Sequence, residues 1–468
     1  MDAHTHEPGT QSSRPRPSAE QRLVSEIVRR VSSGGYETWW TKVTGAGYCA
    51  APIQLSRTKD GAESTVLVRC KNRRQAVCPS CSDLYAGDTW HLVHAGIGGG
   101  DDVPESVASH PLVFVTLTAP SFGAVHRATD SEQPCRHPEA SGACRHGRPT
   151  GCASAHDSRD DLVGQALCID CYHYADQAIF TWHAPELWSR FTLTLRRMLR
   201  RHLTEHGLDP ASVKVSFIKV VEMQRRGVPH FHAIIRLDRS NPSDPRDCLQ
   251  SPSSVVPRTL VDVTREAILA THLEVFAKGG EEVQLQFGVQ FDVQPLPMDS
   301  AHFGDVSGEN LLARRVAGYL AKYVTKSVVD FGLSPRRIGP AAIEHLDITE
   351  HVRHLLRSLV QISAEPGHER ILDSLHTLGY RGHVTTKSRR YSTTMFALRA
   401  KRSQYVQTLR HAPESGAGFI PNGDDIDWEY KSHGHASAGD HLLVISAAIR
   451  ERESRWAARQ LTDRGEEQ

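Results

Sequence analysis

The hydrophobic pattern of residues 112–238 predicts three strands and one long helix. Residues 112–120 are a run of β-branched, aromatic and apolar side chains that ends at Ala-Pro, which is typical of a buried strand. Residues 184–203 repeat apolar side chains at helical spacing and crowd arginine and histidine near the C-terminal end, which indicates an amphipathic helix. Residues 213–223 and 230–238 are strand-like runs, and the glycine in the connecting QRRGVP favours a β-hairpin.

The rest of the chain also mixes helical and strand-like patterns. Helices are expected at 21–31, 264–280, 311–327 and 441–461. One strand or a pair of strands is expected at 281–296, a proline- and serine-rich loop at 239–258, and a Gly/Asp-rich linker at 416–426. An α+β fold follows from these elements.

Length and composition indicate a water-soluble protein. The 468 residues are enough for two or three domains. No apolar run approaches the ~20 residues that a membrane span needs, and the polar N-terminus resembles neither a secretory signal nor an anchor. We therefore expect a cytoplasmic protein with no membrane partner.

Charge is nearly balanced along the whole chain but not within residues 381–402. The formal net charge is +1, so total charge does not indicate a polyanionic partner. The segment 381–402 nevertheless carries no acidic residue and these basic ones: Arg381, Lys387, Arg389, Arg390, Arg399, Lys401 and Arg402. Such a cluster is either a solvated face or a contact with nucleic acid.

Nine of the ten cysteines fall between Cys49 and Cys171, which in a cytoplasmic chain indicates metal ligands or free thiols rather than disulfides. The first expected zinc site consists of Cys49, Cys70, Cys78 and Cys81. The second combines the Cys168/Cys171 pair with Cys144 and Cys152, and its competing ligands are Cys135, His137, His146 and His156. A redox dithiol is the alternative, but neither CxxC pair has a thioredoxin-like context.

Two histidines stand at alternate positions of the second hairpin strand. Residues i and i+2 of a strand face the same side, so His230 and His232 project together while Phe231 faces the core. Glu222, on the partner strand, is close enough to the turn to act as a third ligand. This set would suit Mn²⁺ or Mg²⁺. Two exposed strand histidines without a metal are the alternative.

The helix expected at 311–327 carries two tyrosines and two lysines at helical spacing. Tyr319 and Tyr323 share one face, as do Lys322 and Lys326. A tyrosine oxygen can attack a phosphodiester when cations stabilise the phosphate, and a lysine one turn away can help to place it. The alternative is a buried tyrosine stripe with lysines that reach to solvent.

These motifs resemble those of a known superfamily in their order along the chain. FVTLTAP, then PHFHAII, then YLAKYVTK resembles the arrangement in HUH endonucleases, which include rolling-circle replication initiators, relaxases and related transposases. CKNRRQAVCPSCSDLYAGDTWHLVHAG, LCIDCYHYADQAIFTWHAPELWSRF and LGYRGHVTTKSRRYSTT resemble replication initiators of actinobacterial rolling-circle plasmids and integrative elements. The likeness extends from about Tyr36 to the terminal helix.

The resemblance implies an HUH-type core with a central antiparallel β-sheet flanked by helices, together with zinc-binding segments and a helical C-terminal region. The expected parts are a disordered or helical segment 1–35, a Cys-rich zinc region 36–100, a core 110–330 with a Cys/His-rich insertion 133–175, a basic DNA-contacting region 335–415 and a helical segment 427–468.

The resemblance also implies an activity. His230, His232 and Glu222 would hold the catalytic ion, Tyr323 would attack first, and Tyr319 would act in strand transfer at termination. Lys322 and Lys326 would help to place phosphate or metal. The expected products are a 5′-phosphotyrosine link and a 3′-OH that primes replication.

Partners follow from the same resemblance. The substrate would be single-stranded or hairpin origin DNA, and the 3′-OH would prime a host polymerase. Because the chain has no recognisable Walker A loop, a host helicase would unwind the duplex. The basic, hydroxyl and aromatic residues of RGHVTTKSRRYSTT suit contacts with phosphates and bases. The expected DNA contacts are Arg381, Lys387, Arg389, Arg390 and Tyr391.

Three other functions are compatible with parts of the pattern. A relaxase or transposase would use the same chemistry, although relaxases often place the tyrosine before the histidines. A nonenzymatic zinc-dependent DNA-binding regulator would use the histidines and tyrosines only structurally. A histidine-triad nucleotide hydrolase would want a third alternating histidine, but position 234 is isoleucine.

Overall fold

The computed structural model describes most of the chain, and its described residues divide into two compact units. The described ranges are 18–59, 62–129, 133–136, 142–240, 255–276, 280–296, 311–325, 331–334, 336–410 and 428–465. A terminal unit comprises Met1–Asn72, Val77–Ser82 and Ile420–Gln468, and a central unit comprises Arg73–Ala76 and Asp83–Phe419.

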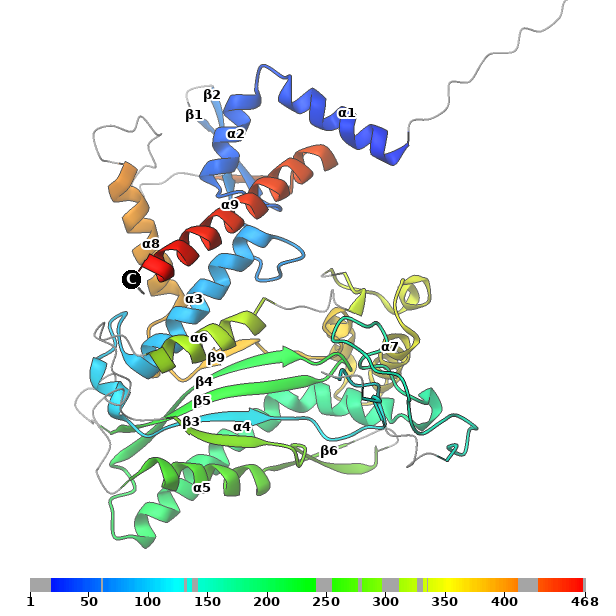
Figure 1. Ribbon diagram of the computed structural model, residues 1–468, viewed down its shortest axis with the longest axis vertical. Helices are drawn as coiled ribbons and strands as arrows, with labels where there is room; N and C mark the ends of the chain where they lie inside the picture. The colour runs from blue at the N-terminus through cyan, green and yellow to red at the C-terminus, as the bar shows by residue number, and fades with distance from the viewer. Residues whose placement is uncertain are drawn as a thin grey trace, which may run out of the picture. The chain divides into compact units, whose positions relative to one another are not determined.

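A five-stranded sheet forms the middle of the central unit (Figure 1). Its strand order is β8 (Asp292–Leu296), β3 (Leu112–Leu117), β5 (Pro229–Arg239), β4 (Val213–Met223) and β9 (Thr385–Lys387). Every neighbouring pair is antiparallel. The expected α+β class with an antiparallel sheet is therefore confirmed, as are the strand after residue 111 and the β4–β5 hairpin.

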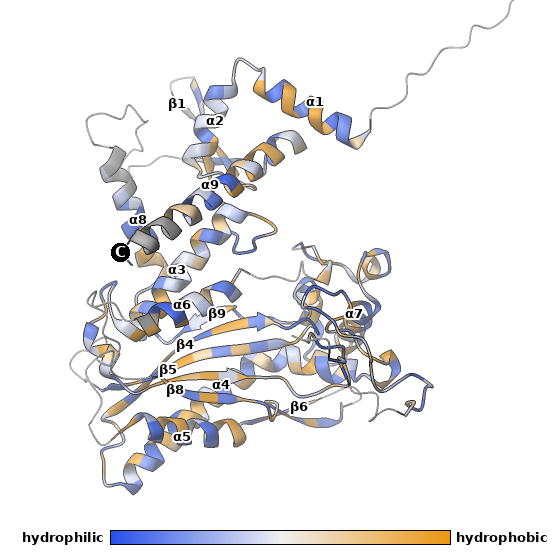
Figure 2. Ribbon diagram, in the orientation of Figure 1, coloured by the Kyte–Doolittle hydropathy of each residue, from blue (hydrophilic) through white to orange (hydrophobic). Residues whose placement is uncertain are grey.

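Helix α4 (Tyr174–Glu205) covers one face of this sheet. The odd-numbered side chains of β5 point towards it, because successive residues of a strand face opposite sides. Phe231 is fully buried, and its ring stacks on that of Trp188 of α4 with centroids 6.0 Å apart. Helices α5 (Pro257–Leu269) and α7 (Glu350–Ile362) pack against α4 and complete this layer. Figure 2 shows hydrophobic stretches along β4 and β5 interrupted by hydrophilic residues.

Three helices contribute to the hydrophobic cluster on the opposite face of the sheet: α3 (Pro79–Gly98), α6 (Leu311–Tyr323) and α8 (Met395–Arg410). Their side chains enclose Ile218, Val220 and Ile234 in a second hydrophobic cluster. His230 and His232 lie at even-numbered positions of β5, as Ile234 does. The alternation therefore turns both histidines towards the α6 side and away from the α4 core.

Several element boundaries differ from the sequence-based expectations. The helix expected at 264–280 ends at Leu269 of α5, and residues His272–Phe276 form β6, which pairs with β7 (Glu282–Gln286). Val275 of β6 and Leu285 of β7 are buried together in the large core, so pairing and burial outweigh the helical pattern there. The predicted loop 239–258 and linker 416–426 lie mainly outside the described residues.

Short 3-10 helices connect the larger elements of the central unit. They are Glu105–Ser109, Ile169–Cys171, Pro340–His345 and Glu369–Thr377. No helix in the described part of the chain is both long and apolar enough to cross a membrane.

The terminal unit brings together residues from both ends of the chain. It contains α1 (Ala19–Val31), α2 (Tyr36–Gly45), β1 (Ile53–Lys59), β2 (Ala62–Val68), the first residues of α3, β10 (Glu429–His433) and α9 (Ala438–Gly465). Its three-stranded antiparallel sheet has the order β10-β1-β2. Arg30 of α1 and Asp440 of α9 form an ion pair at 2.6 Å. Backbone pairing of β10 with β1 thus joins residues of the expected segments 36–100 and 427–468 within this unit.

Candidate active site and metal centres

The β4–β5 hairpin brings the two histidines and the glutamate together. Glu222 is the direct cross-strand partner of His230, and Val220 is that of His232. Directly opposed residues of an antiparallel pair project on the same face, so these side chains meet above the sheet. Oε2 of Glu222 lies 3.7 Å from Nε2 of His232, and the two imidazole rings have centroids 4.6 Å apart. The side chains of the three residues expected to bind the metal thus lie near one another on one face of the hairpin.

Helix α6 places both tyrosines against His232. The ring of Tyr323 stacks on the imidazole with centroids 5.3 Å apart, and Tyr319 meets it edge-on at 5.5 Å. Tyr319 is 44 % exposed, which does not fit a fully buried tyrosine stripe. Lys322 is exposed on the same helix, while Lys326 lies outside the described residues.

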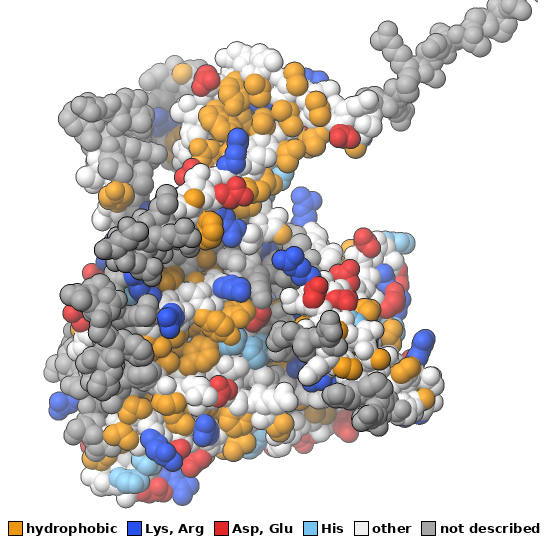
Figure 3. Space-filling view, viewed as in Figure 1, with side chains coloured by type: hydrophobic (Ala, Val, Ile, Leu, Met, Phe, Trp, Pro, Cys, Tyr) orange, Lys and Arg blue, Asp and Glu red, His pale blue; other side chains and the backbone are white. Residues whose placement is uncertain are grey.

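A cavity of about 430 Å³ opens over these residues. It is lined by His230, His232, Glu222, Gln224, Arg225, Arg226, Tyr319 and Tyr323, and by Val125, His126, Val163 and Gly164 of a Cys/His-rich segment. Figure 3 shows histidine side chains beside a hydrophobic area on the visible face. The cavity therefore combines hydroxyl, carboxylate, imidazole and guanidinium groups in a single space.

The charge state of His230 suits metal binding. Burial and the neighbouring His232 lower the pKa of His230 to about 4, so His230 is neutral near pH 7. Nδ1 of His232 lies 3.3 Å from the Thr116 hydroxyl, which can orient the ring. Nε2 of His232 is buried without a hydrogen-bond partner in the described structure and faces Glu222. A buried acceptor of this kind is costly unless something occupies it, so the residues fit a divalent cation.

The turn between β4 and β5 supplies three pocket residues that the sequence patterns did not single out. Nε2 of the Gln224 amide lies 3.3 Å from Nδ1 of His230. Nε of Arg226 donates to Oε1 of Gln224, and the rest of its guanidinium donates to the carbonyls of Ala119 and Pro120. The available signal was the position of QRRG immediately before the histidines.

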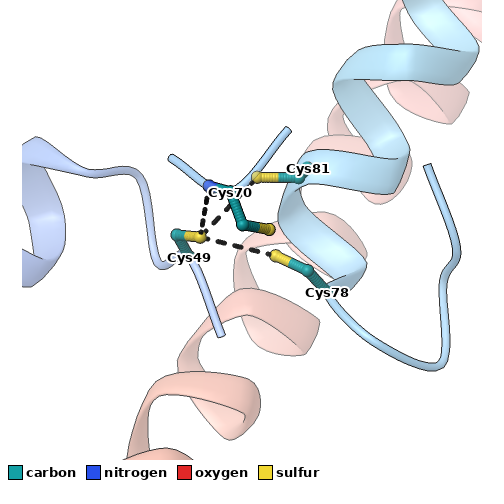
Figure 4. Close-up of side chains that lie close together, drawn as sticks. All are labelled: Cys49, Cys70, Cys78 and Cys81. Carbon is teal, nitrogen blue, oxygen red and sulfur yellow. Dashed lines mark hydrogen bonds between the residues drawn. The ribbon is translucent and has the colours of Figure 1, made fainter. Parts of the chain in front are cut away.

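The first cysteine set is assembled as expected (Figure 4). Sγ of Cys49 lies 3.8 Å from Sγ of Cys78 and 3.7 Å from Sγ of Cys81. Four thiolates at about 2.3 Å from a tetrahedral zinc ion would be about 3.8 Å apart. The backbone N–H groups of Cys70 and Ala50 donate to Sγ of Cys49 and Cys78. This set of four has the spacing of a zinc site.

The second cysteine set differs from the expected one. Cys144, Cys168 and Cys171 lie together, but their fourth neighbour is His146 and not Cys152. Cys152 belongs instead to a separate group with His126, Cys135 and His156. The reason is an isolated β-bridge in which the backbones of Arg136 and Cys152 exchange two hydrogen bonds of 3.1 Å. His137, another candidate ligand, lies outside the described residues.

The expected DNA-contacting residues occupy unlike environments. Tyr391 is fully buried, with the Arg236 guanidinium 5.3 Å from its ring, so it cannot stack on a base in this structure. Lys387 is half-buried and donates from Nζ to the carbonyl of Ser392 at 2.8 Å. Arg381 is exposed but pairs with Glu186. Arg389 is exposed and Arg390 is half-buried.

Comparison with known proteins gives matches over almost the whole chain. The family model described as "RepSA: Replication initiator protein, pSAM2" matches residues 35–449. A protein from Streptomyces ambofaciens named "Replication initiator protein" is 34 % identical over 464 residues, covering 93 % of this chain and 95 % of that protein. No solved structure matches.

Proposed function

Since the chain belongs to the RepSA family of replication initiator proteins, we propose that it starts replication by nicking one origin strand with a tyrosine nucleophile, as an HUH endonuclease. The observation that carries this proposal is the cavity in which Glu222, His230 and His232 of the sheet face Tyr319 and Tyr323 of α6. A nonenzymatic regulator would not need these five side chains to converge.

In this proposal three residues hold the catalytic ion, and two residues of the β4–β5 turn orient one of them. His230, His232 and Glu222 would hold Mn²⁺ or Mg²⁺, which when bound supplies positive charge to stabilise the negative charge developing on the phosphate oxygens. The low pKa of His230 keeps its imidazole neutral. Arg226 orients Gln224, whose amide in turn fixes the ring of His230. The hairpin therefore prepares the site before DNA enters.

Tyr323 is proposed as the first nucleophile. Its phenol oxygen forms a bond to phosphorus while the bond from phosphorus to the 3′ oxygen breaks, and the phenolic proton is balanced by the proton that the leaving oxygen takes up as a 3′-OH. One phosphodiester replaces another, so the step is reversible. Tyr319, one helical turn away, would accept the strand at termination. Lys322 and Lys326 are proposed to help place the phosphate.

A covalent-adduct assay with a single-stranded origin oligonucleotide tests the nucleophile. We expect wild type to form an adduct with Mn²⁺ or Mg²⁺, Tyr323→Phe to lose the first cleavage, and Tyr319→Phe to retain cleavage but lose strand transfer. Tyr405→Phe is the matched control, because Tyr405 is 65 % exposed on α8. An unchanged adduct in the Tyr323→Phe/Tyr319→Phe protein would disprove the assignment, and no adduct from wild type on any origin sequence would favour the regulator.

The catalytic metal has its own test. His232→Gln removes the buried Nε2 that lacks a hydrogen-bond partner, so Mn²⁺ binding measured by calorimetry should weaken together with nicking. Thr116→Val, which removes only the hydroxyl beside Nδ1, should have a smaller effect of about 10- to 100-fold. Equal Mn²⁺ affinity in wild type and His232→Gln would contradict the ligand set.

Further parts of the proposal concern structure and partners. Cys49, Cys70, Cys78 and Cys81 would hold a structural Zn²⁺ ion in the terminal unit. Arg389 and Arg390 would contact origin DNA, with Arg381 and Lys387 nearby in the chain. A host helicase would unwind the duplex, and a host polymerase would extend the 3′-OH. Relaxases and transposases use the same chemistry, so nicking of a replication origin that supports plasmid copying distinguishes the initiator from them.

A further inference from the structure

His126, Cys135, Cys152 and His156 form a compact set of four in the Cys/His-rich segment. Nδ1 of His126 lies 3.2 Å from Nε2 of His156, and Sγ of Cys152 lies 3.3 Å from that same nitrogen. Sγ of Cys135 lies 3.9 Å from Nδ1 of His126. A tetrahedral zinc ion with bonds of about 2.0–2.3 Å needs ligand separations of about 3.3–3.8 Å. The observed separations of 3.2, 3.3 and 3.9 Å lie within or about 0.1 Å outside this range.

We propose that these four side chains hold a structural zinc ion of their own, and that this ion builds one wall of the nicking cavity. The ion is separate from the one that Cys144, His146, Cys168 and Cys171 could hold, because Cys152 cannot serve both sets. In this second set, Nδ1 of His146 lies 3.2 Å from Sγ of Cys171 and 3.7 Å from Sγ of Cys168. The segment thus has ligands for two ions.

The environment of His156 supports its role as a ligand. His156 is 3 % exposed, and its Nδ1 lies 2.6 Å from Oδ2 of Asp160. A carboxylate on one ring nitrogen leaves the lone pair of the other nitrogen free for a metal, which is the usual arrangement around ligating histidines. The backbone N–H of Arg127 also donates to Sγ of Cys135 at 3.3 Å. Groups outside the set of four, the Asp160 carboxylate and the Arg127 backbone, therefore also hold His156 and Cys135 in place.

The same residues connect the metal set to the cavity. The carbonyl of Asp160 accepts a hydrogen bond from the Arg225 guanidinium at 2.7 Å. The ligand His126 lines the cavity itself, together with Val125, Val163 and Gly164. The N–H of Gly164 donates to the carbonyl of His126 at 2.9 Å. The β4–β5 turn thus meets a wall whose shape depends on the four ligands.

Gly164 shows how closely this wall approaches the turn. Its φ is +90°, and a Cβ on it would lie 2.4 Å from the backbone carbonyl carbon of Arg225. Only glycine allows this contact without displacement of one backbone. Gln224, which touches His230, immediately precedes Arg225. A shift of the wall would therefore move the residue that positions a catalytic metal ligand.

Zinc stoichiometry tests the first half of the proposal without any need for nicking activity. Full-length Cys135→Ala/Cys152→Ala and Cys168→Ala/Cys171→Ala proteins should each contain one zinc ion fewer than wild type by mass spectrometry, and the four-fold variant two fewer. A four-fold variant that loses only one ion, or a Cys135→Ala/Cys152→Ala protein that loses none, would overturn the separate site. Asp160→Asn should retain the zinc but release it faster to a chelator.

A glycine variant tests the second half, which rests on the proposed nicking function. Gly164→Ala keeps all four ligands but forces the wall away from Arg225, so we expect full zinc content and a loss of nicking of roughly 10- to 100-fold. Gly142→Ala is the control, since a Cβ there meets nothing within 4 Å. If the Gly164→Ala protein nicks at the wild-type rate, the proposed role of this wall is wrong. If wild type itself does not nick, the proposed function fails while the zinc counts still decide the site.

Discussion

Acidification should destabilise the protein through His351, a buried residue of α7. Its Nε2 donates to the carbonyl of Arg226 at 3.2 Å, and its Nδ1 accepts from the hydroxyl of Tyr174 at 2.9 Å. Burial, together with the nearby His354 and Arg226, lowers the pKa of His351 to about 4, against an ordinary value of 6.5. The unfolded chain therefore takes up a proton between pH 6.5 and 4 that the folded chain does not bind. The free energy of unfolding must fall as the pH falls through this interval.

The size of the effect follows from the difference in pKa. At about 1.4 kcal/mol for each pH unit, the contribution of His351 falls by roughly 3 kcal/mol between pH 6.5 and 4 and is constant above pH 7. His351→Gln has no titrating group, so the free energy of unfolding should depend less on pH by that amount. Urea denaturation followed by tryptophan fluorescence at several pH values measures both proteins.

Tyr174→Phe provides the matched control. It removes the hydroxyl partner but leaves the imidazole buried, so it should lower the free energy of unfolding by about 1–3 kcal/mol at pH 7 and keep the pH dependence of wild type. If His351→Gln loses stability in acid as steeply as wild type, His351 is not the group that takes up the proton.

Three further outcomes are expected. Burial lowers the pKa of Lys219 to about 7, so the lysine destabilises the fold most at and below pH 7, and Lys219→Met should raise the free energy of unfolding there by about 1–4 kcal/mol in urea denaturation. Gly96→Ala places a Cβ 2.1 Å from the ring of Tyr391 and should lower the melting temperature, whereas Gly87→Ala on the same helix meets nothing within 4 Å and should not. Arg389→Ala should weaken DNA binding and reduce its logarithmic salt slope by about 1 in fluorescence titrations.

The hairpin and the shared face of its candidate ligands could be predicted because local rules determine them. Alternation along a strand fixes the shared face of His230 and His232, and a short connection fixes the register that sets Glu222 opposite His230. Helical spacing likewise places Tyr319 and Tyr323 on one face of α6. The sequence alone did not place α6 against this hairpin, since that placement depends on the burial of residues far apart in the chain, Leu320 and Ile234 among them, in one hydrophobic cluster.

The ligand grouping in the Cys/His-rich segment could not be predicted in the same way. Cys152 has a sequence spacing compatible with either set, and only the bridge between Arg136 and Cys152 assigns it. The sequence pattern did not indicate His126, because the next ligand, Cys135, lies nine residues further along the chain, although His156 four residues after Cys152 was a usable signal. The basic segment around Tyr391 favoured a residue that stacks on bases. In the structure its ring is instead buried against Gly96, which has no side chain to keep the ring away.

The pairing of β10 with β1 has a consequence for synthesis of the chain on the ribosome. At roughly 5–20 residues per second, residue 428 is made about 20–70 s after residue 72. During this interval β1 lacks one of its two neighbours and α1 lacks the Asp440 partner of Arg30, while the whole of 83–410 has been made and can fold. The first region translated would thus be among the last to finish folding, and a shortened product without β10 would leave an unpaired strand edge that favours aggregation.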